Sequence, residues 1–466
     1  MGKILYVTEL EDRLKRLKKH DVGSIRDVLP FTSHTSKAIK GDFNNGLGES
    51  VRTICGLLSP KKQKTDELVM NDNPFIEEII NKIECDNDDE RYDLSLFLEA
   101  FLLSDQEKLN PVHPYLFNYL PVDEKKKNEH VKYSRFIRDT LVLEDEEIKE
   151  IFKNQETEDI LSELILTNMN RLNEKKSERL YYEPLLKPLS TLFREDLKFI
   201  SKYKDYFLNS FPLLTHFYTF MYACQLLVQF EKFEKGNYEE IHPFYFALEW
   251  ESVSKRRKVA EDLEGFKYIK EKASRLFVHI HALSQLSYNR LNIIDFEEEP
   301  VRFMTYSSLM EKVGLEGESA LINFLDDIGE WISKYCEWAN IDQPEESENL
   351  SQAYRSLFEC LKKKMNEETC KNFGQNIEFL GANQFLKNRG SLGKVFNISH
   401  EFLRLLSAVC IKNERMPLNQ LFEEYAKRGV TFDRYSKKEI VELLDSLNII
   451  DKKSDSGDAQ YVKPIL

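Results

Sequence analysis

Glycine and proline are scarce in this chain, and the sequence motifs of several enzyme classes are missing. The 466 residues include 17 Gly and 14 Pro, and no regular alternation of strand-like and helix-like segments is visible. Neither a Gly-Lys-Ser/Thr phosphate loop nor a Gly-x-Ser-x-Gly nucleophile elbow occurs, which argues against P-loop NTPases and α/β-hydrolases. These absences predict a mainly α-helical protein rather than an α/β enzyme.

The seven cysteines are odd in number and scattered, and no two form a C-x-x-C pair. Such cysteines are typical of reduced core thiols in a cytoplasmic protein. Cys224 and Cys336 have no His at zinc-site spacing. His279 and His281 lie two apart in an expected helix, so they point to nearly opposite sides. We therefore expect no metal site and no cofactor. The first residues lack a long apolar stretch and position 6 is Tyr, so neither secretion nor N-myristoylation is expected.

Negative charge dominates the chain, but it is unevenly distributed. The net charge is −14, whereas residues 383–466 contain fourteen Lys and Arg against eleven Asp and Glu, a surplus of three. The residues before them therefore carry −17. Because an acidic surface repels phosphates, any contact with nucleic acid must be local, and the C-terminal segment is where it is expected.

Apolar residues at helical spacing predict three helices in the C-terminal segment. The first is expected over Ser399–Cys410 with Ser399 as its N-cap, and the second over Leu418–Lys427, with Gly429 ending it. The third is expected to begin with a capping box, Ser436–Glu439, and a hydrophobic staple between Tyr435 and Ile440.

Two short extended stretches follow the third helical pattern. Ile449–Lys453 and Ala459–Val462 lie on either side of a turn rich in Asp, Ser and Gly, which predicts a β-hairpin. Three helices followed by a hairpin are the pattern of a winged helix-turn-helix domain. The predicted fold is therefore mainly α, a multi-helix body with a C-terminal winged helix-turn-helix domain.

Basic residues lie at the start of the third helix and in the hairpin. In a winged helix that reads DNA, the third helix enters the major groove and the wing lies along phosphates. The exposed face of this helix also carries Glu442 and Asp445, which a phosphate backbone would repel. Contact with duplex DNA and docking to a partner protein are therefore both open. The candidate nucleic-acid-binding residues are Arg434, Lys437, Lys438, Lys452, Lys453 and Lys463.

Three domains are expected along the chain. Residues 1–72 form an N-terminal segment with a Gly/Ser-rich loop, 73–380 a helical middle domain, and 381–466 the winged-helix domain. Within the loop, Glu49-Ser50 stands where a Walker A motif needs Lys-Ser/Thr, so an ordered turn is expected rather than a nucleotide site.

One stretch in the middle domain, Tyr206–Phe230, has no charged residue over twenty-five positions. Its length would span a bilayer, but polar residues such as Asn209, His216 and Gln225 are costly in hydrocarbon. We predict a buried helix at the centre of a soluble domain. The densest basic cluster, Ser254–Lys258, is flanked by acidic residues and is interpreted as a solvated helix surface.

A metal-dependent nuclease would need an acidic residue well before an Asp/Glu-x-Lys tripeptide on a strand. Glu124-x-Lys126 and Glu147-x-Lys149 match the tripeptide, but each lies in a charged stretch without an apolar strand. His20-Asp21 likewise has nothing in sequence to complete a metal phosphohydrolase. Nuclease activity is therefore retained only as an alternative.

Several blocks resemble the G component of DNA phosphorothioation-dependent restriction systems, the DptG (also DndG) family. They are Asp21–Leu58 (DVGSIRDVLPFTSHTSKAIKGDFNNGLGESVRTICGLL), Gly381–Ser399 (GANQFLKNRGSLGKVFNIS) and Phe432–Leu466. The similarity is densest at the two ends of the chain. None of the blocks is a catalytic signature, so the resemblance carries over no catalytic residue.

The resemblance implies a role in bacterial defence against DNA that lacks the phosphorothioate mark. It also implies two partners, an ATPase-like F subunit and a helicase-like H subunit, which would supply motor activity. We therefore expect a non-catalytic assembly subunit that engages duplex DNA through its winged helix. The alternatives are a stand-alone transcriptional regulator, a nuclease subunit with an unrecognised site, and a pure scaffold.

Overall fold

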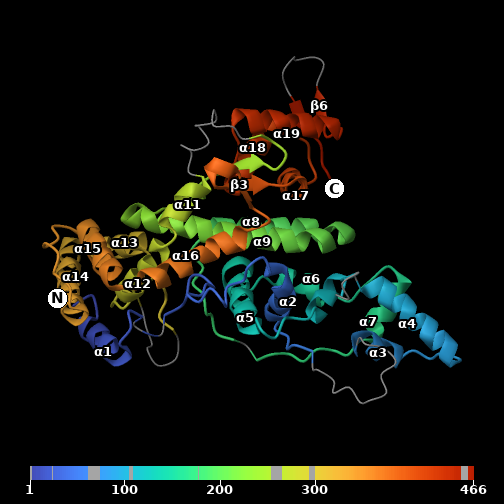
Figure 1. Ribbon diagram of the computed structural model, residues 1–466, viewed down its shortest axis with the longest axis horizontal. Coiled ribbons are helices and arrows are strands. Elements are labelled where there is room, and N and C mark those ends of the chain that lie inside the picture. Colours follow the sequence, from blue (N-terminus) through green and yellow to red (C-terminus); the bar gives the residue numbers. More distant parts are fainter. Residues whose placement is uncertain are drawn as a thin grey trace.

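The computed structural model describes residues 3–21, 23, 25–60, 74–103, 109–176, 178–252, 265–292, 300–452 and 460–466. Within these ranges the chain is mainly helical, as the sequence predicts, and two small sheets lie in its second half. In Figure 1 two long helices, α8 and α9, cross the middle of the molecule. Helical groups lie below them and to one side, and the last elements of the chain lie above.

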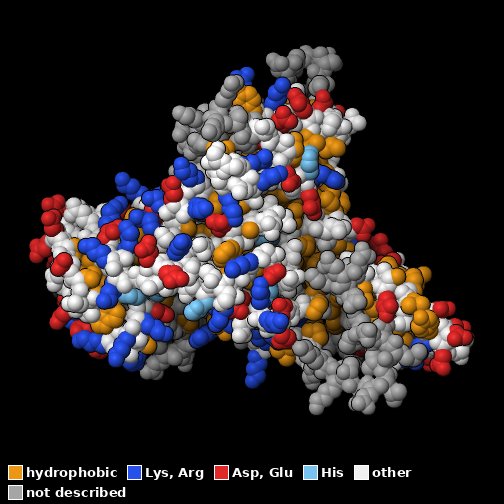
Figure 2. Space-filling view, viewed as in Figure 1, with side chains coloured by type: hydrophobic (Ala, Val, Ile, Leu, Met, Phe, Trp, Pro, Cys, Tyr) orange, Lys and Arg blue, Asp and Glu red, His pale blue; other side chains and the backbone are white. Residues whose placement is uncertain are grey.

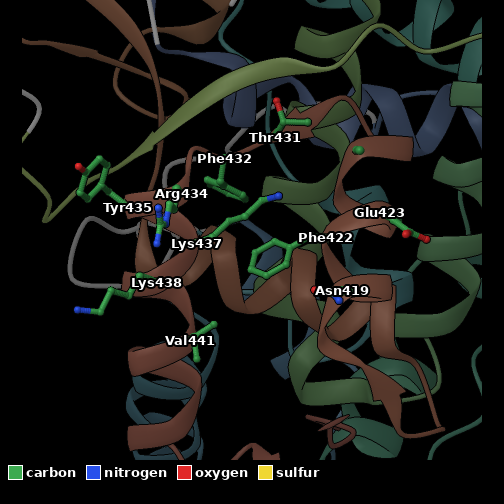
Figure 3. A pocket seen from close by; sticks show the side chains of 11 residues that line it. Asn419, Phe422, Glu423, Thr431, Phe432, Arg434, Tyr435, Lys437, Lys438 and Val441 are labelled. Carbon is green, nitrogen blue, oxygen red and sulfur yellow. The ribbon is translucent and has the colours of Figure 1, made fainter. Parts of the chain in front are cut away.

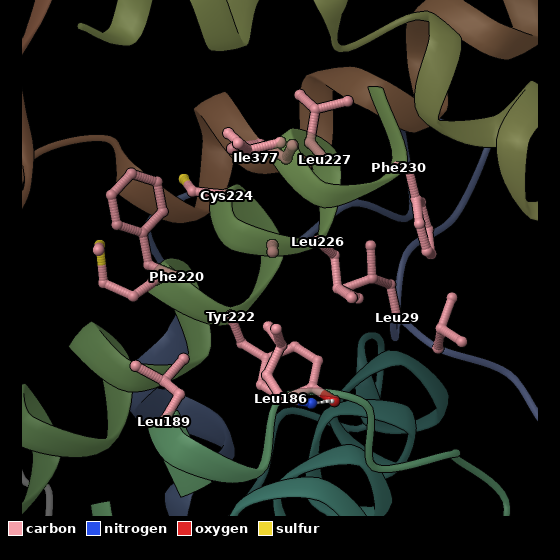
Figure 4. Packing of buried hydrophobic residues seen from close by; sticks show 14 of the residues in the cluster. Leu29, Leu186, Leu189, Phe220, Tyr222, Cys224, Leu226, Leu227, Phe230 and Ile377 are labelled. Atoms are coloured by element: carbon pink, nitrogen blue, oxygen red, sulfur yellow. Dashed lines mark hydrogen bonds between the residues drawn. The ribbon is translucent and has the colours of Figure 1, made fainter. Parts of the chain in front are cut away.

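The central helix is α9, Lys204–Glu231. Between Phe211 and Phe230 every residue but one is buried, and a helix that is apolar all round is one that protein surrounds. Figure 4 shows its side chains packed among those of neighbouring helices, where the Tyr222 hydroxyl accepts a hydrogen bond from the backbone N–H of Leu186 at 3.4 Å. The predicted buried helix over Tyr206–Phe230 is confirmed.

Among the described helices, α9 is also the one whose length and composition would allow it to cross a membrane. However, 94% of its most apolar window is buried inside the protein. That degree of burial matches a core helix rather than a span that faces lipid.

Two groups of helices pack around α8 (Lys187–Ile200) and α9, and they share one large hydrophobic core. One group is formed by α2 (Leu47–Cys55), α5 (Lys127–Phe136) and α6 (Glu146–Lys153), with the short helices η1 (Phe43–Gly46), η2 (Pro114–Tyr119) and η3 (Ile137–Val142). The other is formed by α1 (Val7–Leu17), α11 (Phe266–Lys272), α12 (Arg275–Leu286), α13 (Tyr306–Leu315), α14 (Glu318–Ala339), α15 (Leu350–Lys364) and α16 (Glu367–Gly381), with η4 (Phe233–Lys235).

A second, smaller core lies at one end of the molecule. It is formed by α3 (Pro74–Ile80), α4 (Asp88–Leu102) and α7 (Ile160–Asn168), whose apolar residues cluster apart from the main core. Figure 1 places these three helices at the lower right, beyond α6.

A four-stranded sheet joins the body to the C-terminal segment. Its order is β2-β3-β1-β5, with β1 at Phe244–Leu248, β2 at Leu386–Asn388, β3 at Lys394–Ile398 and β5 at Val430–Thr431. The strand from the body, β1, lies between β3 and β5 and is parallel to both. The sequence predicted only helices from residue 73 to 372, and β1 corrects this: its five residues are all buried, which suits aromatic side chains in a sheet.

The remaining C-terminal elements are three helices and a three-stranded sheet. The helices are α17 (His400–Ile411), α18 (Leu418–Lys427) and α19 (Arg434–Ser446). The sheet has the order β4-β7-β6, with β4 at Met416–Pro417, β6 at Ile450–Lys452 and β7 at Gln460–Val462. The first two helices follow the prediction, and the Ser399 side chain accepts from the N–H of Phe402 as an N-cap does. The paired strands β6 and β7 match the predicted hairpin, whose turn lies outside the described residues.

The start of the third helix was predicted wrongly. Its N-cap is Asp433, whose carboxylate accepts a hydrogen bond from the N–H of Ser436 at 2.6 Å, and Ser436 lies inside the helix. Tyr435 is 64% exposed and forms no hydrophobic staple. Asp and Ser are equally good N-cap residues. The S-x-x-E pattern at Ser436 therefore could not be preferred over Asp433, which lies three residues earlier and is the actual N-cap.

The Gly/Ser-rich loop is shorter than expected. Phe43–Gly46 forms the turn η1, but residues 47–50 already belong to the buried helix α2. There Glu49 pairs with Arg52 at 3.0 Å, so the residue that breaks the Walker A pattern has a structural partner. The basic cluster Ser254–Lys258 lies outside the described residues.

A buried ion pair fastens the C-terminal helices to the core. Arg428, at the end of α18, donates to both carboxylate oxygens of Asp196 in α8, at 2.8 and 2.6 Å. The two side chains are 1% and 0% exposed. The hydroxyl of Tyr218 in α9 donates to the same carboxylate at 2.5 Å. Next to this pair, Gly429 has φ +82°, a conformation that residues with a Cβ rarely adopt, and a Cβ at this position would force the end of the Met221 side chain of α9 to move.

We expect Asp196→Asn to lower the free energy of unfolding by about 3–5 kcal/mol, because it leaves the Arg428 charge buried without a counter-charge. Urea denaturation followed by circular dichroism measures this loss. Replacing all three groups together (Asp196→Leu, Tyr218→Phe, Arg428→Met) should cost less than the single change. The exposed pair Arg290–Glu316, with N···O 2.9 Å, provides the control: Glu316→Gln should cost less than about 1 kcal/mol. If Asp196→Asn and Glu316→Gln lower the free energy of unfolding equally, the buried pair does not hold the C-terminal helices on the core.

Candidate nucleic-acid interface

A groove between α18 and α19 collects three of the six predicted residues. Its volume is about 1030 Å³, and Arg434, Lys437 and Lys438 line it from the start of α19. Figure 3 shows these side chains across from Phe422, Asn419 and Glu423 of α18. The groove therefore carries three positive charges and one negative charge, on a chain whose net charge is −14.

The three basic side chains differ in their contacts. The Lys437 ammonium lies over the Phe422 ring, 5.0 Å from its centroid. Lys438 points away from α18 in Figure 3 and forms an exposed ion pair with Glu442, with N···O 3.5 Å. For Arg434, which is exposed, no ion pair or hydrogen bond of its guanidinium occurs among the described residues. Ion pairs this exposed contribute little, so all three cations can exchange their present contacts for a phosphate.

The start of α19 is held firmly although its surface is charged. The Ser436 hydroxyl donates to both carboxylate oxygens of Glu251, at 3.1 and 2.8 Å, and both residues are buried. Arg389 in turn donates to the backbone carbonyls of Leu248 and Glu251 at 2.6 and 3.0 Å. Residues of the body thus fix the end of α19 from which the basic side chains project.

The placement of these charges opposes the helix dipole. An α-helix carries partial positive charge at its N-terminus, so a basic residue in the first turn, such as Arg434, costs about 0.3–1 kcal/mol, and the effect weakens beyond that turn. No acidic residue lies in the first turn of α19, and only its N-cap, Asp433, offsets the basic ones. A bound anion would remove this repulsion, because helix N-termini and basic side chains both attract phosphate.

Of the other three predicted residues, Lys463 is the one whose side chain the structure describes, and it does not line the groove. Lys463 pairs with Asp451 of β6, with N···O 3.3 Å, and Arg415 reaches the same carboxylate at 3.0 Å. Lys452 is the last residue of β6, and Lys453 lies outside the described residues. Glu442 and Asp445 lie farther along α19 and are exposed, so the basic character of the helix is confined to its beginning.

Sequence reasoning missed the aromatic side of the groove. Phe422, Phe432 and Tyr435 line it beside the basic residues. From sequence, Phe422 had no role beyond the expected helix Leu418–Lys427, and Tyr435 was interpreted as part of a hydrophobic staple. The interleaving of Tyr435 with Arg434 and Lys437 was the available signal, since aromatic and basic residues together are typical of nucleic-acid surfaces.

No cluster of metal ligands is present in the part of the chain that the structure describes: no group of three or more His, Cys, Asp or Glu there could hold a metal ion. The two nuclease-like tripeptides lie in surface ion pairs. Lys126 pairs with Asp42, and Lys149 pairs with Glu146 at 2.6 Å. Glu147 pairs with Lys198 at 2.8 Å.

We expect Asp433→Ala to loosen the first turn of α19, because its N–H groups lose their cap at a cost of about 1 kcal/mol. Hydrogen–deuterium exchange should become faster in peptides covering 434–440 and stay unchanged in α9. Glu442→Ala, which removes only an exposed partner of Lys438, is the control and should leave exchange in 434–440 unaltered. Unchanged exchange in Asp433→Ala would contradict the assigned cap.

No protein-family model matches this chain, and no curated protein matches it at a significant level.

Proposed function

We propose that this protein is a non-catalytic subunit of a bacterial phosphorothioation-dependent restriction complex, and that it holds duplex DNA in the groove between α18 and α19. The observation that carries the DNA-binding part is the cluster of Arg434, Lys437 and Lys438 at the start of α19. The restriction system and its ATPase-like and helicase-like partners come from the resemblance of the terminal blocks to the DptG family.

The order of the C-terminal elements supports a winged-helix assignment. Three helices, a short strand after the first of them, and a final antiparallel pair β6–β7 that joins this strand in one sheet follow the pattern of that domain. In such domains the third helix reads the major groove with its N-terminal residues. Arg434, Lys437 and Lys438 lie in the first half of α19, whereas its acidic residues Glu439, Glu442 and Asp445 follow them along the helix.

Docking of the same groove to a partner protein is the second candidate for this surface. The aromatic side chains Phe422 and Tyr435 favour it, because aromatic residues beside Arg are typical of protein interfaces. The two candidates differ in their response to salt, since release of counterions makes binding to DNA fall steeply as salt rises.

Lys437→Glu with Lys438→Glu should weaken binding to a fluorescein-labelled 25-base-pair duplex by about tenfold or more. The slope of log K against log salt should also fall by about 2, because two phosphate contacts are lost. Fluorescence anisotropy at several salt concentrations measures both quantities. Duplexes of unrelated sequence should bind roughly equally, whereas a stand-alone regulator would prefer one sequence strongly.

The matched control is Lys362→Glu with Lys363→Glu, an adjacent and exposed lysine pair in α15. It changes the net charge by the same amount and should leave affinity and slope nearly unchanged. If the α19 variant keeps the wild-type affinity and slope, DNA does not occupy the groove. Cleavage of plasmid in Mg²⁺ or Mn²⁺ by the purified protein would support the nuclease alternative instead.

An exposed apolar surface on α4 supports the assembly part of the proposal. Tyr92, Leu96 and Phe97 are 54%, 46% and 49% exposed, and Figure 2 shows apolar side chains gathered over this end of the molecule. Exposed Asp88, Asp89, Glu90 and Asp93 lie in the same helix. Contiguous apolar surface of this kind marks an interaction site. The acidic border fits a partner surface that is apolar with basic residues at its edge.

Phe97→Asp should therefore reduce co-purification with the ATPase-like and helicase-like partners after co-expression, because it places a charge in an apolar contact. Leu315→Asp is the control, since Leu315 is 82% exposed in α13, away from α4. Quantitative pull-down compares the two. Equal recovery of partners by Phe97→Asp and Leu315→Asp would exclude α4 as the docking surface.

A further inference from the structure

A second large cavity lies between the N-terminal segment and the body. Its volume is about 870 Å³, within the range of small-molecule sites. Five separate parts of the chain line it: residues between Lys18 and Ser33, the helix α5, the stretch around Tyr181, the helix α12, and the junction of α15 and α16. It shares no residue with the groove between α18 and α19.

Lysines without carboxylate partners gather around this cavity. Lys18, Lys19, Lys132 and Lys364 all line it and are exposed. No ion pair of these four is found among the described residues, whereas many basic residues described elsewhere in the protein, such as Lys3 and Lys334, are paired. In Figure 2 Lys and Arg side chains gather over α1, the helix that precedes Lys18. Four unpaired cations around one concave site attract an anion with several charges.

The interior of the cavity offers a hydrogen-bond acceptor. The Asp27 side chain is open to water inside the cavity and accepts no hydrogen bond from a described residue. The low polarity of the protein around the cavity and the neighbouring charge of Asp21 raise the pKa of Asp27 to about 6, although the nearby charge of Lys132 lowers it. Burial also lowers the pKa of His281 to about 4, so this imidazole is neutral at physiological pH and adds no positive charge.

One wall of the cavity is aromatic. Phe277 is half-buried; it stacks on Phe373, with ring centroids 4.5 Å apart, and meets the edge of His281 at 4.4 Å. The part of this aromatic wall that faces the cavity can contact another flat ring, either edge-on or in an offset stack, because aromatic rings attract one another in both geometries.

We propose that this cavity binds a nucleotide, with its phosphates on the lysines, its base against Phe277, and a base amino group donating to Asp27. A nucleoside phosphate unites the three features that the cavity offers: several negative charges, a flat ring and a hydrogen-bond donor. The site is unrelated to a Walker A loop, which the chain lacks. The inference is independent of the proposed DNA groove.

The test uses the full-length protein and isothermal titration calorimetry with five probes: ATP, GTP, CTP, UTP and inorganic pyrophosphate. At least one nucleotide should bind saturably below about 1 mM. Lys364→Glu should weaken that binding by about tenfold, the effect of losing one charge-assisted contact. Lys363→Glu is the control, because this exposed neighbour in α15 does not line the cavity. The α19 variant Lys437→Glu with Lys438→Glu should bind the nucleotide as the wild type does.

The absence of saturable binding by all five probes would overturn the proposal. Equal weakening in Lys363→Glu and Lys364→Glu would overturn it as well, because binding would then follow net charge rather than the cavity. If pyrophosphate binds as tightly as the best nucleotide, Phe277 and Asp27 do not contribute to binding by contacting the base. A change in the preference among the four nucleotides in Asp27→Asn would support the contact with the base.

Discussion

The orientation of the C-terminal helices relative to the body depends on a buried ion pair between the Asp196 carboxylate and the Arg428 guanidinium. Asp196 and Arg428 are 232 residues apart in sequence and form two hydrogen bonds in the interior. A buried charge that loses its partner is far more costly than an exposed one. The helices α17–α19 can therefore pack on α8 and α9 only in an orientation that keeps this pair together. The strand β1, held between β3 and β5, adds backbone hydrogen bonds that favour the same orientation.

This constraint gives the groove between α18 and α19 a fixed direction relative to the rest of the protein. Glu251, directly after the body strand β1, accepts from Ser436 inside α19, so the body itself positions the basic end of that helix. The exposed apolar face of α4 belongs to a separate small core at the other end of the helical array. The proposed DNA surface and the proposed partner surface thus lie on different parts of one framework, as a subunit that connects DNA to other proteins requires.

Patterns within a few residues of sequence predicted helices and their caps well. They could not predict contacts between residues far apart in sequence, such as strand pairing and buried ion pairs. The uncharged stretch within α9, the N-cap Ser399 and the helix α18 follow from periodicity and capping within a few residues. The strand β1 did not, because an aromatic run suits a buried helix as well as a strand until its neighbours are known. Arg428 is similar: nothing near it in sequence indicates burial, since its partner lies in α8. The N-terminal cavity draws on five separate segments, so its lysines could not be grouped from sequence.

The candidate site was predicted only in part, for a physical reason. Sequence shows that Arg434, Lys437 and Lys438 share the start of a helix, but it does not show which basic residues already have carboxylate partners. Lys463 shares Asp451 with Arg415, whereas the cations of α19 oppose the helix dipole and have only exposed or aromatic contacts. A helix whose first turns repel their own side chains is less stable alone than it would be beside an anion. The repulsion between the N-terminus of α19 and its own basic side chains is therefore the feature that distinguishes a surface suited to phosphate from an ordinary solvated surface.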